Sequence, residues 1–381
     1  MKHVVLIAPA IEDYCVEYAN AVATRSKVTL ICSKSHFMTH AAFVDPAVDL
    51  RMIDWPRHRS PWNVVFIVRL ARLIHALRPD VVHFLSEGVL WLNLLVPIIR
   101  KYGIVTTVHD VSYHPGDNAS QRIPRWSANF LIANSDRLIV HGATLRAQAE
   151  RIYPKLAGRI EILPHRPITK YWKIAQDSGL RRAADTGVSV LFFGRIYAYK
   201  GLDVLLRSSA RIIDQFDDIR FVIAGRGDDM EKYERMMSDK KYFKIINKFI
   251  PDAETARLFT DADIIALPYL EASQSGVLAI ANAFGKPVIV TNVGELGHSV
   301  EDGVSGLVIP PNDPAALAEA VLRLARDAEL RRRLGEAGRL AGQAATAAEP
   351  FAEKAARMYE AVSHPTTRQS RWTHISAVSG A

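Results

Sequence analysis

The chain is 381 residues long, 49% hydrophobic and 23% charged, which excludes disordered and fibrous proteins and predicts a globular protein of two to three domains. Its only cysteines, Cys15 and Cys32, exclude a disulfide framework and favour a reducing cytoplasm. No apolar run reaches the ~18 residues of a membrane-spanning helix. The apolar run at residues 4–10 is short for a signal peptide and precedes Glu12 and Asp13, so we interpret it as a buried strand.

The net charge of +8 lies entirely in the first half of the chain. Residues 1–180 hold 22 Lys and Arg against 14 Asp and Glu, whereas residues 181–381 hold 26 of each kind. Part of the excess gathers around Trp55 and Trp62, as Arg57, His58, Arg59, Arg69, Arg72 and Arg78. This cluster fits either an ordinary solvated helix face or a surface that meets an anionic membrane. A nucleic-acid partner is not predicted, because no zinc-finger spacing, RNA-binding sheet motif or helix-turn-helix accompanies the cluster.

The first half alternates apolar strands with helical stretches, which is the pattern of a parallel sheet covered on both faces. We predict helices at 14–25 and 64–77 and strands at residues 4–8, 28–32, 81–84, 104–109, 137–140 and 160–163. The apolar segment 88–99 is interpreted as one buried helix. The polar segment 170–187 lacks sustained periodicity and is interpreted as a linker, with the first domain ending at residue 172 and the linker proper covering 173–187.

The same alternation starts again after the linker, with predicted strands at 188–193, 220–224, 244–250, 264–267, 287–290 and 306–309. Predicted helices are 201–216, 252–260, 275–284, 315–327, 328–342 and 350–362. Asp252 is the expected N-cap of its helix, and Gly285 ends another. The sequence therefore predicts an α/β protein with a second domain at 188–349, two parallel sheets facing each other across a cleft, and a loose tail at 364–381.

The motif most informative about chemistry follows the predicted strand at 188–193. Gly194 and Arg195 begin a short loop, and Lys200 and Gly201 open the next helix. A strand–loop–helix with glycine at the turn exposes backbone N–H groups and the positive end of a helix dipole, and two cations add to it. This pattern favours a diphosphate ligand, although two surface cations on an ordinary loop fit it as well.

Two further loops follow strands of the same predicted sheet. The first is a tight turn at Gly225, which fails as a dinucleotide fingerprint because Met230 occupies the position of the last glycine. The second precedes the helix at 275–284. Ser273 or Ser275 can cap that helix, the amides of Gly276 and Val277 form a second anion site, and Glu271 can accept hydrogen bonds from sugar hydroxyls. A capped helix whose Glu271 only favours the dipole fits equally.

Together these segments resemble the C-terminal domain of the family 4 (group 1) retaining glycosyltransferases, which have the GT-B fold of two Rossmann-like domains. The matching segments are 194–201, the turn at Gly225, 247–250, 268–276, 285–289, 291–295 and 302–317. In the first half, segments 80–83, 107–110, 137–142 and 162–165 resemble strand ends of the family's acceptor domain. The resemblance also implies that helix 350–362 crosses back to the first domain.

The resemblance implies transfer of a sugar from a UDP- or GDP-sugar to a hydroxyl, with retention of configuration and without a metal or other cofactor. Arg195 and Lys200 would stabilise the leaving diphosphate, Glu271 would contact donor hydroxyls, and His109 would lie near the transferred sugar. The donor would be bound by the residues around these loops, namely Gly194, Gly225, Asn247, Ile250, Ser273, Ser275, Gly276, Val277 and Glu295.

Two departures from the family pattern stand out. Ile280 occupies the position of the glutamate that usually holds the nucleotide ribose, and Glu295 is the candidate substitute. The usual glycine pair of the N-terminal loop is absent, because the chain after Pro9 reads AIEDYC.

The basic first half suits an anionic or lipid-linked glycan acceptor and a cytoplasmic enzyme peripheral to the inner face of the plasma membrane. Alternative hypotheses are a nucleotide-sugar epimerase of the same fold and a non-catalytic nucleotide-sugar binder.

Overall fold

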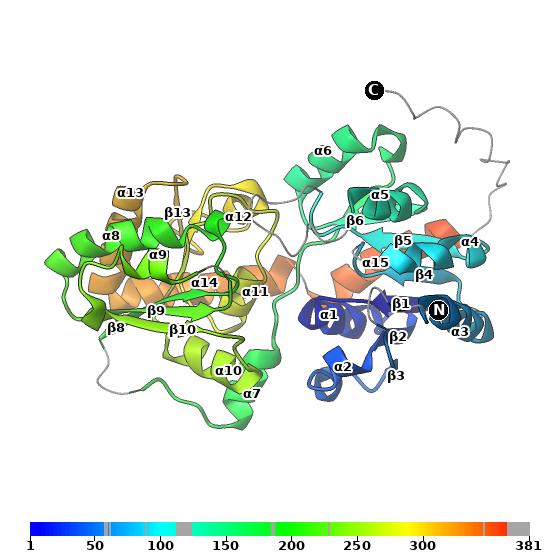
Figure 1. Ribbon diagram of the computed structural model, residues 1–381, viewed down its shortest axis with the longest axis horizontal. Helices are drawn as coiled ribbons and strands as arrows, with labels where there is room; N and C mark the ends of the chain where they lie inside the picture. Colours follow the sequence, from blue (N-terminus) through cyan, green and yellow to red (C-terminus); the bar gives the residue numbers. More distant parts are fainter. Residues whose placement is uncertain are drawn as a thin grey trace.

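The chain folds into two α/β lobes joined side by side (Figure 1). The structure is a computed structural model that describes residues 1–56, 60, 62–87, 90–111, 124–183, 187–227, 229–345 and 347–363. Each lobe is built on a parallel sheet with helices on both faces, as the near-continuous apolar strands predict. The predicted fold class of two parallel-sheet domains is therefore confirmed.

The N-lobe sheet has seven strands among the described residues, in the order β3-β2-β1-β4-β5-β6-β7. They are β1 (His3–Ala8), β2 (Lys27–Ser33), β3 (Val48–Ile53), β4 (Val81–Phe84), β5 (Gly103–Thr107), β6 (Arg137–Val140) and β7 (Ile160–Ile162). The accompanying helices include α1 (Glu12–Val22), α2 (Lys34–Phe37), α3 (Asn63–Leu77), α4 (Leu95–Ile98), α5 (Arg125–Ala133) and α6 (Ala143–Ile152). Every residue of the central strand β1 is buried.

The C-lobe sheet has the order β10-β9-β8-β11-β12-β13. Its strands are β8 (Val188–Phe193), β9 (Ile219–Gly225), β10 (Phe243–Asn247), β11 (Ile264–Leu267), β12 (Val288–Thr291) and β13 (Leu307–Ile309). Its helices are α7 (Lys170–Asp177), α8 (Leu202–Gln215), α9 (Glu231–Glu234), α10 (Asp252–Asp261), α11 (Gly276–Ala283), α12 (Gly294–His298), α13 (Pro314–Arg326) and α14 (Ala328–Ala345).

The last helix, α15 (Ala348–Ser363), leaves the C-lobe and packs against α1, β4 and β5 of the N-lobe, as predicted. A buried hydrogen-bond network fixes it there. The Tyr359 hydroxyl lies 2.8 Å from that of Tyr18 and 2.9 Å from His83 Nδ1, while His83 Nε2 lies 2.9 Å from Thr107 Oγ1. The N-lobe therefore needs the end of the chain to complete its core.

Some sequence predictions need correction. The predicted linker begins with α7, which packs on α10, so its first part is helical. Strand β3 was missed because this edge strand carries polar Asp49 and Arg51. The apolar segment 88–99 is no single helix: its described part forms a 3₁₀ turn, η2 (Leu90–Leu94), and then the short α4.

The cap predicted for α10 is also wrong. Pro251 occupies the N-cap position and no side chain caps the helix, since the Asp252 carboxylate lies 2.6 Å from Lys170 Nζ instead. The predicted tail at 364–381, and Arg57, His58 and Arg59 of the basic cluster, lie outside the described residues.

Candidate functional site

A pocket of about 380 Å³ opens between the lobes, where the carboxyl ends of both sheets meet. It brings together six residues predicted from the sequence, namely His109, Gly194, Arg195, Lys200, Gly276 and Val277. Its N-lobe side also includes Tyr14, Asp110 and His165, and its C-lobe side includes Gln274 and Ile280.

The turn after β8 is built on two glycines. Gly194 adopts φ 112° and Gly225, at the end of the neighbouring β9, adopts φ 151°. A Cβ on Gly225 would lie 1.7 Å from the carbonyl oxygen of Gly194, so any side chain there would push the turn away. Gly225 does not line the pocket itself; it supports the loop that does.

Aromatic rings hold the two cations of this loop. The Arg195 guanidinium donates to the Tyr199 hydroxyl at 3.2 Å, and Lys200 Nζ lies 3.7 Å from the centre of the Tyr269 ring. A cation over an aromatic face keeps its charge and is held in position. Gly201, at φ 68°, fits directly against the carbonyl of Pro268 and brings Lys200 to the pocket.

Helix α11 points its N-terminus into the same pocket. Of the two predicted caps, Ser273 and Ser275, it is Ser275 that occupies the N-cap position, and its Oγ accepts a hydrogen bond from the Leu278 amide at 3.3 Å. Ser273 and Ser275 are both buried and support the loop, whereas Gly276 and Val277 line the pocket. The first amides of a helix have no intrahelical acceptor, so this end of α11 suits an anion beside Arg195 and Lys200.

Across the pocket lies a layer of buried imidazoles. His109 and His141 have ring centres 4.9 Å apart, and the Tyr14 ring packs edge-on against both. Burial lowers the pKa of His109 and lowers that of His141 well below its usual value, and it lowers the pKa of His165 to about 4. These rings are therefore neutral at neutral pH.

The amide of Gln274 reaches across the cleft to this layer. Its Nε2 lies 2.9 Å from His109 Nδ1, which joins the C-lobe loop to the N-lobe floor. Sequence analysis did not single out Gln274 or His141 as site residues. The only available signal was their position inside segments that were already matched, 268–276 and 137–142.

Besides Gly225, Ser273, Ser275 and Glu295, three more predicted residues lie outside the pocket lining. Glu271 is exposed before α11, and Asn247 is exposed at the end of the edge strand β10. Ile250 is buried in the C-lobe core. Ile280, at the position of the expected glutamate, lines the pocket as an apolar residue.

Glu295 requires a correction. Its carboxylate accepts hydrogen bonds from the amides of Thr144 and Leu145 at the start of α6 in the other lobe. It therefore neutralises the positive end of a helix and joins the lobes. The structure does not support its expected role as a ribose ligand.

The N-terminal loop reaches the pocket without glycine. Ile11 lines it at φ 60°, ψ 55°, the left-handed conformation that β-branched residues rarely adopt. Glu12 and Asp13 follow it and also line the pocket. This loop brings two carboxylates to the N-lobe side of the pocket and has local backbone strain. Because carboxylates repel anions, the C-lobe side with Arg195 and Lys200 is the better place for an anion.

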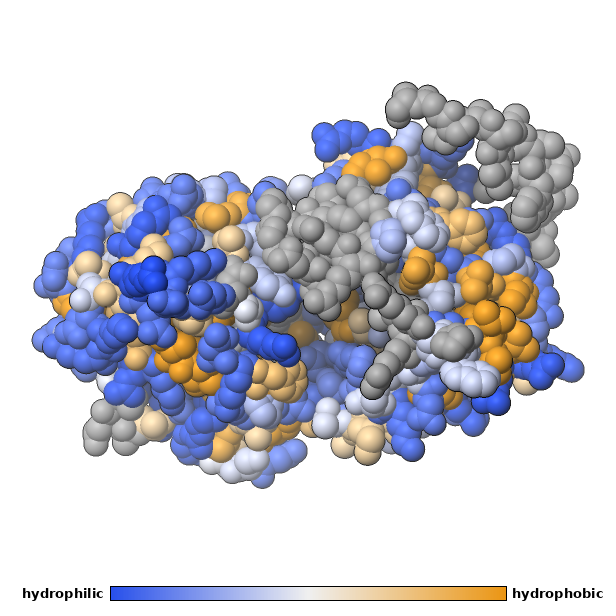
Figure 2. Space-filling model, viewed as in Figure 1, coloured by the Kyte–Doolittle hydropathy of each residue, from blue (hydrophilic) through white to orange (hydrophobic). Residues whose placement is uncertain are grey.

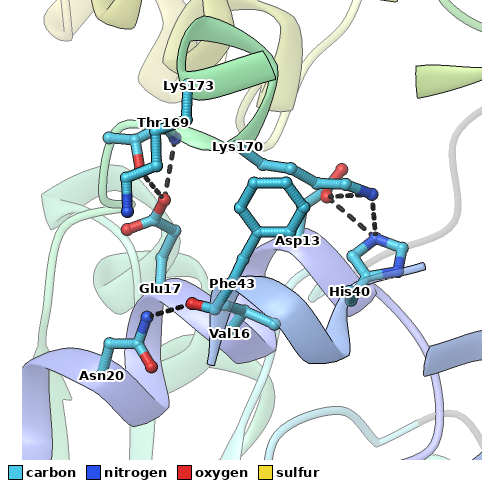
Figure 3. Close-up of a pocket in the computed structure, with 9 residues that line it drawn as sticks. All are labelled: Asp13, Val16, Glu17, Asn20, His40, Phe43, Thr169, Lys170 and Lys173. Atoms are coloured by element: carbon cyan, nitrogen blue, oxygen red, sulfur yellow. Dashed lines mark hydrogen bonds and ion pairs between the residues drawn. The ribbon is translucent and has the colours of Figure 1, made fainter. Parts of the chain in front are cut away.

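Behind the pocket, a polar contact joins the lobes around Lys170 (Figure 3). The Lys170 side chain is 4% exposed, and its Nζ lies 2.6 Å from Asp252 of the C-lobe and 3.0 Å from His40 of the N-lobe. Asp13 lies 3.8 Å away and also accepts a hydrogen bond from Tyr171 at 2.6 Å. The ammonium is thus paired with both lobes at once.

Two family models match the chain, one for each lobe. "Glycosyltransferase Family 4" matches residues 11–165, and "Glycosyl transferases group 1" matches residues 187–327. A D-inositol 3-phosphate glycosyltransferase from Thermobifida fusca is 27% identical over 64% of this chain and 59% of its own length. A phosphatidyl-myo-inositol mannosyltransferase from Mycobacterium leprae is 31% identical over 40% of this chain and 41% of its own. The chain thus spans less than two thirds of these relatives.

Solved structures with similar folds cover nearly the whole chain. Sucrose-phosphate synthase from Thermosynechococcus elongatus has a TM-score of 0.70 at 18% identity, covering 95% of this chain and 99% of that one. HepE from Anabaena, solved with UDP and glucose, has a TM-score of 0.69 at 14% identity, covering 95% and 100%. This likeness supports the arrangement of the two lobes. Among the described residues, none of the helices has the length and hydrophobicity to traverse a bilayer.

Proposed function

Because this chain belongs to the family 4 (group 1) glycosyltransferases, we propose that it transfers a sugar from a nucleotide diphosphate sugar to a hydroxyl acceptor. The observation that carries this proposal is the convergence of Arg195, Lys200 and the N-terminus of α11 on one pocket, opposite His109. All three features suit a diphosphate.

Departure of a nucleoside diphosphate develops negative charge, and fixed cations and helix dipoles lower the barrier because they need no reorganisation. Arg195 and Lys200 serve this purpose, and the amides of Gly276 and Val277 bind phosphate oxygens. Since side chains supply the charge, the proposed reaction uses no metal and no other cofactor. Glu271 would contact donor hydroxyls beside the loop, and the proposed outcome is retention of configuration.

The donor proposed is a UDP- or GDP-sugar. HepE, a neighbour in fold, was solved with UDP and UDP-glucose. The acceptor proposed is anionic, as part of a glycan or a lipid-linked glycan. The names of the relatives include D-inositol 3-phosphate and phosphatidyl-myo-inositol, which both carry phosphate.

The test is to incubate the protein with a panel of UDP- and GDP-sugars, with and without membrane extract, and to measure free nucleoside diphosphate. Release that depends on the extract supports transfer. Conversion of the sugar without acceptor would favour an epimerase, and binding without turnover would favour a nucleotide-sugar binder; either result would refute the proposal.

We further propose that the enzyme works at the inner face of the plasma membrane as a peripheral protein. Hydrophobic side chains gather on the N-lobe over α3 and α4 (Figure 2). This N-lobe apolar patch consists of Trp62, Val64, Val68, Leu94, Ile98, Trp126 and Phe130, which are 40–70% exposed. Arg69, Arg72 and Lys101 are exposed on the same elements or next to them. Apolar side chains with flanking cations suit the headgroup layer of an anionic membrane.

Sedimentation with anionic and neutral vesicles tests this surface. We expect binding to anionic vesicles that weakens at high salt, because exposed charges are then screened. Trp62→Ser and Arg69→Glu should each reduce binding, whereas Phe249→Ser, which removes a side chain 75% exposed on the C-lobe, should not. Equal sedimentation of all three variants, or no binding at low salt, would refute a membrane role.

A further inference from the structure

The tautomers of His109 and His141 are fixed by their backbone partners. His109 Nε2 lies 2.9 Å from the carbonyl oxygen of Leu85, and His141 Nδ1 lies 2.9 Å from that of Leu163. A carbonyl oxygen only accepts hydrogen bonds, so both of these ring nitrogens carry hydrogen. In the neutral rings, His109 Nδ1 and His141 Nε2 therefore present lone pairs.

These two nitrogens face each other at 3.1 Å. Both residues are buried, with exposures of 4% and 7%, so two acceptors lie at hydrogen-bonding distance in a site that water barely reaches. The amide of Gln274 donates to His109 Nδ1 from 2.9 Å, but its own Oε1 is buried without a hydrogen-bond partner. With both rings neutral and their other N–H groups bonded to the backbone, three acceptor atoms (His109 Nδ1, His141 Nε2 and Gln274 Oε1) remain beside a single donor group, the Gln274 amide, which is costly in a buried site.

One additional proton removes this mismatch. We propose that His109 and His141 bind one proton between them as an imidazole–imidazolium pair, with Gln274 as the positioning residue that reaches the pair across the cleft. The proton comes from solvent. When the proton is on His109 Nδ1, this N–H donates a hydrogen bond to His141 Nε2. A 180° rotation of the Gln274 amide then allows its Oε1 to accept a hydrogen bond from the same N–H.

The charged groups around the pair act in opposite directions. Burial and the neighbouring His165 disfavour the charged form, and Asp110 favours it. The buried Glu87 carboxyl accepts a hydrogen bond from the His109 backbone, and burial raises its pKa to about 7, so it favours the charged pair only where it is ionised. Tyr14 from α1 packs on both rings, Glu12 and Asp13 line the pocket beside it, and Arg195 and Lys200 lie on its far side. The free protein therefore binds the shared proton only at acid pH.

A diphosphate in the pocket adds negative charge that favours the protonated pair. This step of the inference rests on the proposed function. Because Gln274 belongs to the C-lobe and the two histidines to the N-lobe, the proton also strengthens a contact that exists only when the lobes are together. Donor binding, proton uptake and lobe contact are then linked, and the proton is released when the nucleoside diphosphate leaves.

The experiment is a pH titration of the full chain labelled with ¹⁵N-histidine, with signals assigned from His109→Gln and His141→Gln. We expect His109 Nδ1 and His141 Nε2 to shift together in one step that corresponds to one proton. Saturating UDP or GDP should move this step up by about one pH unit or more. Separate steps for the two rings, or neutral rings down to acid unfolding, would overturn the proposal.

Variants of Gln274 separate positioning from a structural role. Gln274→Glu should raise the midpoint of the shared step, since it adds a carboxylate, and Gln274→Leu should lower it. A merely structural side chain would move both midpoints in the same direction or not at all. If neither nucleotide binds, the proposed function fails, but the shared step in the free protein still decides the proton pair. If a nucleotide binds without moving the step, the link to the donor fails alone.

Discussion

Acid should destabilise the N-lobe through His83. Its ring is fully buried between Tyr359 and Thr107, and burial lowers its pKa to about 3. In the unfolded chain the pKa returns to about 6.5, so the unfolded state binds one more proton below that pH. Stability is therefore intact above pH 6.5 and is lost as the pH falls towards 3. At pH 5, which is about 1.5 units below the pKa of the unfolded state, the free energy of unfolding is lower by about 2 kcal/mol.

His83→Gln should remove the part of the pH dependence that His83 contributes, because glutamine can hydrogen-bond but does not titrate; the other buried histidines keep theirs. The measurement is urea unfolding at pH 7.5 and pH 5, followed by tryptophan fluorescence. No tryptophan lies between residues 173 and 371, so the signal reports chiefly on the N-lobe. The loss of unfolding free energy between the two pH values should be about 2 kcal/mol smaller in the variant than in the wild type.

The matched control is His298→Gln, which changes an exposed histidine of the C-lobe and should keep the wild-type dependence. Each protein's unfolding free energy at pH 5 is subtracted from its own value at pH 7.5. A loss of packing energy that is the same at both pH values therefore drops out of the difference. If His83→Gln loses as much stability as the wild type on acidification, the buried neutral histidine is not the cause.

Three further predictions concern the site. Arg195→Ala or Lys200→Ala should lower kcat/KM by about 2.7–4 kcal/mol in transition-state free energy, comparable to the loss of an oxyanion donor; unchanged turnover would reject their role. Glu271→Gln should weaken use of the sugar donor more than binding of the nucleoside diphosphate, measured by kinetics and calorimetry, and equal effects would contradict a contact with donor hydroxyls. Ile11→Gly should raise the unfolding free energy by about 1 kcal/mol in urea melts, because it relieves a left-handed β-branched residue; a loss of that size would show that the strain is absent.

Local spacing was enough to predict the C-lobe half of the site. Gly194, Arg195, Lys200 and Gly201 lie within eight residues, so the strand–loop–helix that joins them follows from short-range geometry. The cap at Ser275 is equally local. The fold class followed from the alternation of apolar strands and helical stretches.

Contacts between the lobes could not be predicted. Gln274 and His109 are separated by 165 residues, and no periodicity brings their two loops together. Helix α7 was missed for a related reason. Lys170 is buried there by partners from other elements, whereas sequence patterns treat lysine as a surface residue. Glu295 was misplaced because its partner, the start of α6, is also on the other lobe.

The buried ammonium of Lys170 restricts how the two lobes can open. Separating the lobes here would take the Lys170 ammonium away from Asp13 and His40 while Asp252 stays with it, and the loss of partners around a buried charge disfavours movement at this point. We therefore expect any widening of the pocket mouth to pivot about this point, with a gap that grows with distance from it. The two lobes would then rotate about the Lys170 contact instead of sliding apart. Ligands could enter and leave the pocket without breaking that contact.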